Sequence, residues 1–121
     1  MHCEVRSADR TFFDGEATIV VARSTRGEFA VMDDHAPMLA AIGRGPLRVK
    51  TSETERVFAC FGGSLRVSPG AEVTVLVEDA VPLEEIDLAL GESAQGSTPS
   101  ETDGSVDARR DLLHRIKETY A

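Results

Sequence analysis

Short runs rich in β-branched residues, divided by turn residues at intervals of about 8–12 positions, dominate the first 80 residues of this chain. Most runs alternate polar and apolar side chains, the period of a half-buried strand. They cover residues 3–6, 17–22, 27–31, 47–50, 56–61, 64–67 and 72–77. Short strands at this spacing predict a mainly β fold, a sandwich or a barrel.

Residues that favour bends separate these runs. We expect turns or bulges at Asp14-Gly15, 43–46, Gly62-Gly63 and 68–71, because Gly and Asn/Asp tolerate positive φ and Pro fixes a bend. The polar stretch 51–55 is the most favourable hairpin tip.

After residue 81 the pattern becomes helical. Pro82 suits a first helical turn, and apolar residues then recur until Gly91, which predicts a short amphipathic helix. Residues 91–105 are rich in Gly, Ser and Pro and predict a flexible linker. We therefore divide the chain into a β-sandwich domain, 1–81, and a C-terminal helical region, 82–121.

A second helix is predicted for 106–121, with Ser105 as its N-cap. Its apolar stripe comprises Leu112, Leu113, Ile116 and Tyr120. Arg109 and Arg110 contribute to a locally basic end, so this helix suits an acidic partner or the chain's own sandwich.

Composition narrows the class of protein. The formal net charge is -8, with 13 Lys and Arg against 21 Asp and Glu, which argues against nucleic-acid binding. No apolar run approaches a membrane span and no leader precedes the strands, so we expect a soluble, unexported chain. Cys3 and Cys60 have no neighbouring ligands, which predicts free thiols in a reducing compartment and no metal site, although a bridge between neighbouring strands stays open.

The polar stretch from Asp33 to His35 is better explained as a surface turn than as a catalytic site. Asp33 or Asp34 could orient His35 toward Ser64, but no nucleophile elbow surrounds that serine. The same loop lacks a second ligand cluster for a metal. The glycine pairs precede strand patterns rather than helices, so they do not predict a phosphate loop.

Four motifs recur in order along the first two-thirds of the chain. They are Phe13-Asp14-Gly15, Gly27-Glu28, His35-Ala36-Pro37, and Gly62-Gly63 followed by Val67. In this order and at these separations, the set resembles the amino-terminal sandwich of the epsilon subunit of the bacterial F-type ATP synthase. The resemblance spans about residues 5–87.

That resemblance implies a flattened β-sandwich followed by helices, in a non-catalytic rotor subunit of the central stalk. It implies partnership with the gamma subunit and the c-ring, coupling of proton translocation to ATP synthesis, and peripheral attachment at the cytoplasmic face of the bacterial membrane through the complex. By position, Gly27 and Glu28 correspond to the c-ring loop, and the gamma contacts correspond to His35, Pro37, Ile42 and Arg44. It implies no cofactor.

The C-terminal region departs from the family pattern. Many relatives restrain ATP hydrolysis by extending these helices into the alpha/beta head, and some bind ATP through an Arg-Ala pair. Here Leu90-Gly91 stands in place of that pair, so the resemblance does not predict ATP binding. The long linker and short last helix resemble shortened actinobacterial forms, and the regulatory candidates are Leu112, Leu113, Ile116, Arg109 and Arg110.

Two rival functions stay open. One is a nucleotide sensor in which Arg109, Arg110 and Arg115 lie opposite Asp87. The other is a free-standing adaptor with the same sandwich.

Overall fold

The computed structural model describes residues 1–70, 72–86 and 104–120, with backbone alone for 104–109. Within these residues, eight strands precede a 3₁₀ turn and one α-helix. Their bounds are β1 (His2–Arg6), β2 (Thr11–Glu16), β3 (Ile19–Ser24), β4 (Gly27–Met32), β5 (Met38–Lys50), β6 (Glu55–Ser68), β7 (Glu72–Val77), β8 (Ala80–Pro82), η1 (Leu83–Glu85) and α2 (Gly104–Tyr120). The mainly β prediction is confirmed.

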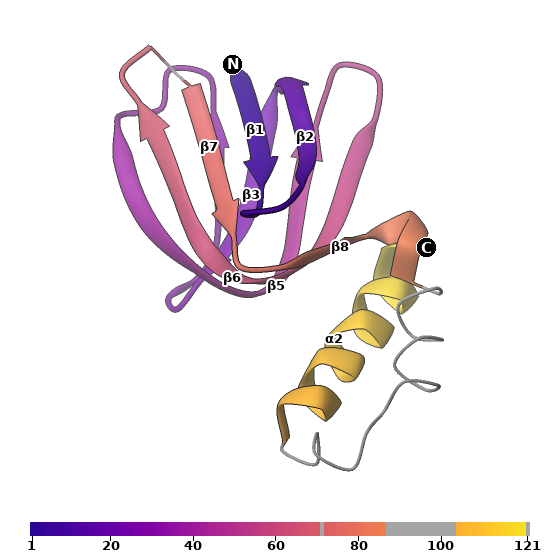
Figure 1. Ribbon diagram of the computed structural model, residues 1–121. Coiled ribbons are helices and arrows are strands. Elements are labelled where there is room, and N and C mark those ends of the chain that lie inside the picture. The colour runs from indigo at the N-terminus through magenta and orange to yellow at the C-terminus, as the bar shows by residue number, and fades with distance from the viewer. Residues whose placement is uncertain (71, 87–103, 121) are drawn as a thin grey trace.

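Two long strands fold one sheet into two layers. The strand order is β2-β1-β7-β6-β5-β3-β4, with β8 also paired to β6. The second half of β6 pairs with β7, while its first half pairs with β8. Similarly, β5 pairs with β3 only through residues 48–50. In Figure 1, β5 and β6 curve below the other strands. We call the layer with β2, β1 and β7 the first layer, and the layer with β4, β3 and β8 the second layer.

The main core lies between these layers. It consists of alternate strand residues that point inward, as the period-2 pattern predicted. Phe58, Leu47 and Leu65 are its largest fully buried side chains. Cys3 and Cys60 belong to this core as free thiols, so the open disulfide alternative is wrong. Burial raises the pKa of Cys3 to about 12 and that of Cys60 to about 11.

Several predicted turns proved to be strand interiors. Asp14-Gly15 lies within β2 opposite β1, and residues 43–46 lie within β5. Residues 56–61 and 64–67 form one strand, β6, because Gly62 and Gly63 bend it at φ values of 100° and 148° without ending it. The predicted bend at Gly62-Gly63 is therefore present, but neither this pair nor 14–15 nor 43–46 ends a strand, because glycine marks a bend as readily as a turn.

The hairpin tip at 51–55 is confirmed. Lys50 pairs with Glu55, and the Thr51 Oγ1 atom accepts a hydrogen bond from the Thr54 amide at 3.0 Å. The bend at 68–71 is confirmed over its described part, where Gly70 has φ 92°.

The C-terminal region differs from prediction at both helices. Pro82 ends β8 instead of opening a helix, and the chain continues as the 3₁₀ turn η1, whose C-cap is Ile86. The rest of the predicted first helix, and the linker as far as residue 103, lie outside the described residues. The last helix is confirmed, but α2 begins at Gly104, so Ser105 lies within it and is not its N-cap.

Candidate partner-binding surface

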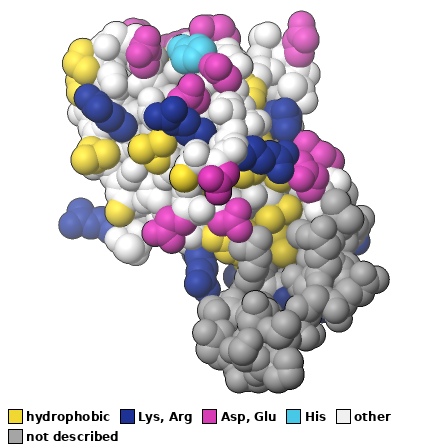
Figure 2. Space-filling view, viewed as in Figure 1, with side chains coloured by type: hydrophobic (Ala, Val, Ile, Leu, Met, Phe, Trp, Pro, Cys, Tyr) yellow, Lys and Arg dark blue, Asp and Glu magenta, His cyan; other side chains and the backbone are white. Residues whose placement is uncertain are grey.

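The outer face of the first layer carries exposed apolar residues among arginines. Cross-strand pairing aligns these residues in two rows across β1, β7, β6 and β5. One row is Arg6, Leu76, Ser64 and Ala41; the next is Glu4, Thr74, Arg66 and Leu39. We call these eight residues the partner face. Figure 2 shows hydrophobic and basic side chains side by side on the front of the sandwich.

Two leucines on this face are unusually open to solvent. Leu39 is 74% exposed and Leu76 is 44% exposed. A hollow of about 760 Å³ lies beside them, lined also by Pro37 and Met38. Contiguous exposed apolar surface bordered by charged groups is typical of protein-binding sites.

Arginine gives this face a local charge opposite to that of the whole chain. The Arg6 Nε atom lies 3.2 Å from a Glu4 carboxylate oxygen, so its charge is partly neutralised. Arg66 is exposed between Leu39 and Thr74 and has no ion pair among the described contacts. The arrangement suits a partner that is mainly apolar and carries a carboxylate opposite Arg66.

The 33–37 loop borders the partner face. Asp34 has φ 65°, and the half-buried His35 ring nitrogen Nδ1 lies 2.7 Å from the Ala36 carbonyl oxygen. Pro37 is exposed and directly precedes β5. The predicted gamma-contact residues His35 and Pro37 therefore lie together beside the leucines.

The other two predicted gamma contacts lie differently. Ile42 is 6% exposed and belongs to the main core, so it supports the fold and cannot present its side chain to a partner. Arg44 is exposed farther along β5. Sequence analysis missed Leu39 and Leu76; an apolar residue alternating outward in a strand was the signal available.

The catalytic alternative is not supported by geometry. Ser64 lies opposite Ala41 and Leu76 in the sheet, whereas the His35 ring contacts the carbonyl oxygen of its neighbour Ala36. Among the described residues, no group of three His, Cys, Asp or Glu side chains could hold a metal ion. The polar loop is a surface loop.

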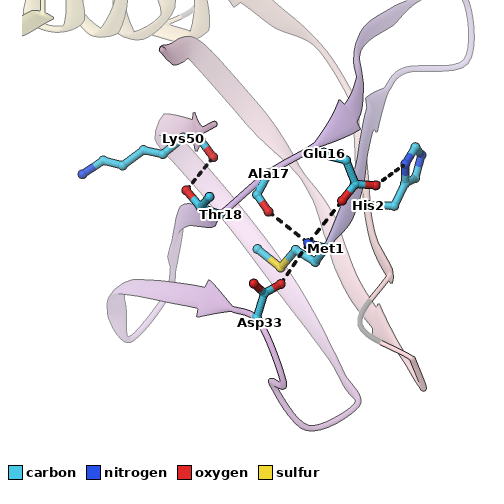
Figure 3. Close-up of polar contacts among 7 residues, drawn as sticks. All are labelled: Met1, His2, Glu16, Ala17, Thr18, Asp33 and Lys50. Carbon is cyan, nitrogen blue, oxygen red and sulfur yellow. Dashed lines mark hydrogen bonds and ion pairs between the residues drawn. The ribbon is translucent and has the colours of Figure 1, made fainter. Parts of the chain in front are cut away.

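The amino terminus is bonded to Asp33 at the start of that loop (Figure 3). The Met1 ammonium donates hydrogen bonds to the Ala17 carbonyl oxygen at 3.1 Å and to Asp33 Oδ1 at 2.9 Å, and lies 3.4 Å from a Glu16 carboxylate oxygen. The hydrogen bond to Asp33 is the main reason that the pKa of this ammonium is raised. The contacts join the starts of β1 and β3 to the loop that precedes β5.

The predicted c-ring residues begin β4, directly after the two-residue tip of the β3–β4 hairpin. Gly27 has φ 118°, which a side chain would strain, and Glu28 is exposed beside it. The Ser24 hydroxyl donates to the Gly27 carbonyl at 3.1 Å and accepts from the Arg26 amide at 3.1 Å. These bonds hold a tight tip that presents one acid and one base to solvent.

Helix α2 covers the second layer, on the opposite side of the sandwich from the partner face. The predicted stripe Leu112, Leu113 and Ile116 is buried in a second cluster, against Val57, Ala59, Val81 and Ile86. The Arg48 guanidinium lies 5.7 Å from the centre of the Tyr120 ring, close enough for a cation–π contact. The last helix therefore docks on its own sandwich, as Figure 1 also shows.

The basic residues of α2 bear on the nucleotide-sensor alternative. Arg110 is half-buried and Arg115 is exposed. The Arg109 side chain and Asp87 lie outside the described residues, so that alternative stays a prediction.

Two ion pairs fasten η1 to the sandwich. Glu85 accepts two hydrogen bonds from the Arg10 guanidinium, at 3.1 and 2.7 Å, which lower the pKa of this carboxyl. Glu84 accepts one from Arg56 at 3.0 Å. No described helix is long and apolar enough to cross a membrane.

Comparison with known proteins gives consistent matches. Residues 1–83 match the family model described as "ATP synthase, Delta/Epsilon chain, beta-sandwich domain". An ATP synthase epsilon chain of Streptomyces griseus is 36% identical over 95% of this chain and 93% of its own length. One from Rubrobacter xylanophilus is 33% identical over 97% of this chain and 85% of its own length.

Solved structures share the fold. A chain in the Tetrahymena thermophila mitochondrial ATP synthase central stalk and c-ring structure superposes with a TM-score of 0.71 at 13% identity, covering 96% of this chain and 95% of that one. A chain of the Euglena gracilis mitochondrial ATP synthase gives 0.65 at 23% identity, covering 96% and 76%.

Proposed function

The chain belongs to the ATP synthase delta/epsilon chain family, and from that membership we propose that it is a non-catalytic rotor subunit of the F-type ATP synthase central stalk. In this role it binds the gamma subunit and the c-ring and helps to couple proton translocation to ATP synthesis. It attaches peripherally, at the cytoplasmic face of the bacterial membrane, through the complex. Burial of both thiols in their neutral form agrees with a structural rather than a catalytic role.

The observation that carries this proposal is the partner face. Leu39 and Leu76 lie open to solvent beside the His35 and Pro37 loop, where the family resemblance implies a gamma contact. We assign gamma binding to Leu39, Leu76 and Arg66, with His35 and Pro37 at the border. Ile42 acts from the core, by keeping β5 in place.

The hairpin tip supplies the second contact. Gly27 and Glu28 project from a rigid turn, which suits a short polar loop such as those of a c-ring. Arg44 remains a candidate at the gamma side because it is exposed on β5 beyond the buried Ile42.

Regulation of hydrolysis is assigned to α2. While its three apolar residues are buried on the second layer, they cannot also contact the catalytic head. We infer that any restraint of ATP hydrolysis requires α2 to leave this position, with Arg109 and Arg110 then available to the head.

A matched pair of substitutions tests the proposal. Covering the 74% of Leu39 that is now exposed contributes about 1–2 kcal/mol, so Leu39→Lys raises the Kd for the gamma subunit about five- to thirty-fold. Met32 is 54% exposed at the end of β4 and is not one of the eight residues of the partner face, so Met32→Lys serves as the control. Both variants are added to a synthase depleted of its epsilon subunit, and proton pumping is measured.

The expected result is that Leu39→Lys restores coupling only at a concentration about five- to thirty-fold higher than the unmodified chain needs, whereas Met32→Lys restores it at the same concentration. Equal affinity of both variants for gamma would remove the partner face from the assignment. Failure of the unmodified chain to bind a synthase from the same source would reject the rotor role and favour the adaptor.

A further inference from the structure

One edge of the first layer lacks most of the features that keep sheet edges from pairing. Residues 38–42 of β5 pair with β6 on one side, while β3 pairs only with residues 48–50 on the other. No described strand pairs with the free side of 38–43. A free edge presents unpaired backbone N–H and C=O groups, which are a template for another strand.

The other edges are protected by ordinary means. The β2 edge carries Asp14 and Glu16 and lies beside an irregular register between Val5 and Arg6. The β4 edge carries Glu28, and β8 is only three residues long. Charges, irregularities and short length each discourage edge pairing.

The 38–43 edge is longer than β8 and carries no charge, and its one irregularity lies at its end, where Gly43 has no register partner opposite the bend of β6. Its sequence is Met-Leu-Ala-Ala-Ile-Gly, without charge or proline, and it contains the most exposed large apolar side chain described, Leu39. A monomer with such an edge is prone to aggregation. The chemistry of this edge therefore fits a strand that is normally covered.

Space for a covering strand is present. A groove of about 500 Å³ runs beside the edge, lined by Met38 and Leu39 on β5 and by Phe29 and Ala30 on β4. Arg26 is the charged residue among those that line it, and His35 lies there too. An incoming segment would be apolar, with an acidic residue near Arg26.

The groove is continuous with the partner face. Met38 and Leu39 line both the groove and the hollow beside Leu76. A strand added at this edge would extend the first layer and lie next to Leu39 and Ala41, the β5 residues of the partner face. One partner can therefore use both features.

We propose that residues 38–43 of β5 accept an extended apolar segment of the gamma subunit as an added β-strand, an inference that rests on the proposed function. Main-chain hydrogen bonds provide the attachment, and Leu39 and the groove select the side chains. The side-chain contacts of the partner face then fix the orientation.

Amide hydrogen exchange at single-residue resolution tests this, with the full chain free and bound to the gamma subunit. In a strand paired on one side, alternate amides are already protected. Addition of a strand slows the intervening amides of 38–43 by at least about tenfold, and amides of the β2 edge, 11–16, keep their rates. The slowing requires ordered hydrogen bonds, which a flat side-chain contact does not provide.

Each other outcome has a definite meaning. Binding to gamma with unchanged exchange at 38–43 overturns the added strand but leaves the rotor role intact. No binding overturns both proposals. Concentration-dependent protection in the free chain, with dimers by sedimentation, would make a second copy the occupant and overturn the assignment to gamma.

Discussion

Substitution of Gly63 by alanine tests how the sheet changes layers at the bend in β6. A Cβ atom there would lie 2.8 Å from the Val77 Cα atom and 3.0 Å from the Leu76 carbonyl carbon, both backbone atoms of β7. The residue also has φ 148°. Because β7 pairs with β6 at this point, its backbone cannot retreat without breaking the ladder.

Alanine substitutions at two other glycines separate the cost of a positive φ from the cost of steric overlap. Gly70 has φ 92° with nothing near its would-be Cβ, and Gly43 has neither a positive φ nor a neighbour within 4 Å. Gly43→Ala stabilises the folded protein by about 0.4–1 kcal/mol, because alanine lowers the conformational entropy of the unfolded chain. At Gly70 an alanine must adopt a left-handed backbone conformation, which costs about 1–2 kcal/mol. This cost outweighs the gain, so the free energy of unfolding falls by about 1 kcal/mol.

At Gly63 a steric cost of about 1–3 kcal/mol is added, for a total loss of about 2–4 kcal/mol. Urea unfolding measures this series, and the Gly63→Ala midpoint falls by about 1–2 M. If Gly63→Ala were no less stable than Gly70→Ala, the backbone would have room to relax. The close approach of β7 would then not be what requires glycine at the bend.

Three further predictions follow from buried and ion-paired groups. Leu113→Ala removes a fully buried side chain whose packing contributes about 2–5 kcal/mol to the docking of α2, so the amides of α2 exchange at least about thirty-fold faster. Unchanged exchange would mean that the position of α2 does not depend on this cluster. Native Cys3 and Cys60, with pKa values of about 12 and about 11, react with a thiol reagent at pH 8 far more slowly than in urea, whereas equal rates would contradict their burial. Arg10 lowers the pKa of Glu85, so the stabilisation by this ion pair is present above the ordinary pKa of 4.5 and is lost as pH falls through the folded pKa. The difference in free energy of unfolding between wild type and Glu85→Gln therefore shrinks in acid, and a constant difference would exclude a contribution from this pair.

Helix α2 shows that a local sequence pattern predicts a helix but not the surface on which the helix packs. The stripe of Leu112, Leu113 and Ile116 predicted one apolar face, and that face is buried. The sequence did not indicate what would cover it. The complementary surface comes from outward residues of β6 and β8, such as Val57 and Val81, which a period-2 reading assigns to solvent.

The sequence pointed to only part of the proposed contact surface. Motif order drew attention to the His35–Pro37 loop and to Gly27 and Glu28, because those positions depend on local backbone geometry, and their roles as contacts stay predictions. Ile42 was assigned to a contact but is buried, since alternation within a strand does not say which face is the core.

By itself, the sequence determined most of the strand segments, the last helix and membership of a family, because these depend on local periodicity and on the order of short motifs. It did not predict β2, β8 or the first half of β5. Tertiary structure decided that 43–46 and 62–63 continue their strands, because only pairing across the sheet distinguishes a bend from a turn. It also decided that Leu39 lies open on a free edge and that α2 docks on the opposite layer. Both are relations between residues distant in sequence, which no local pattern encodes.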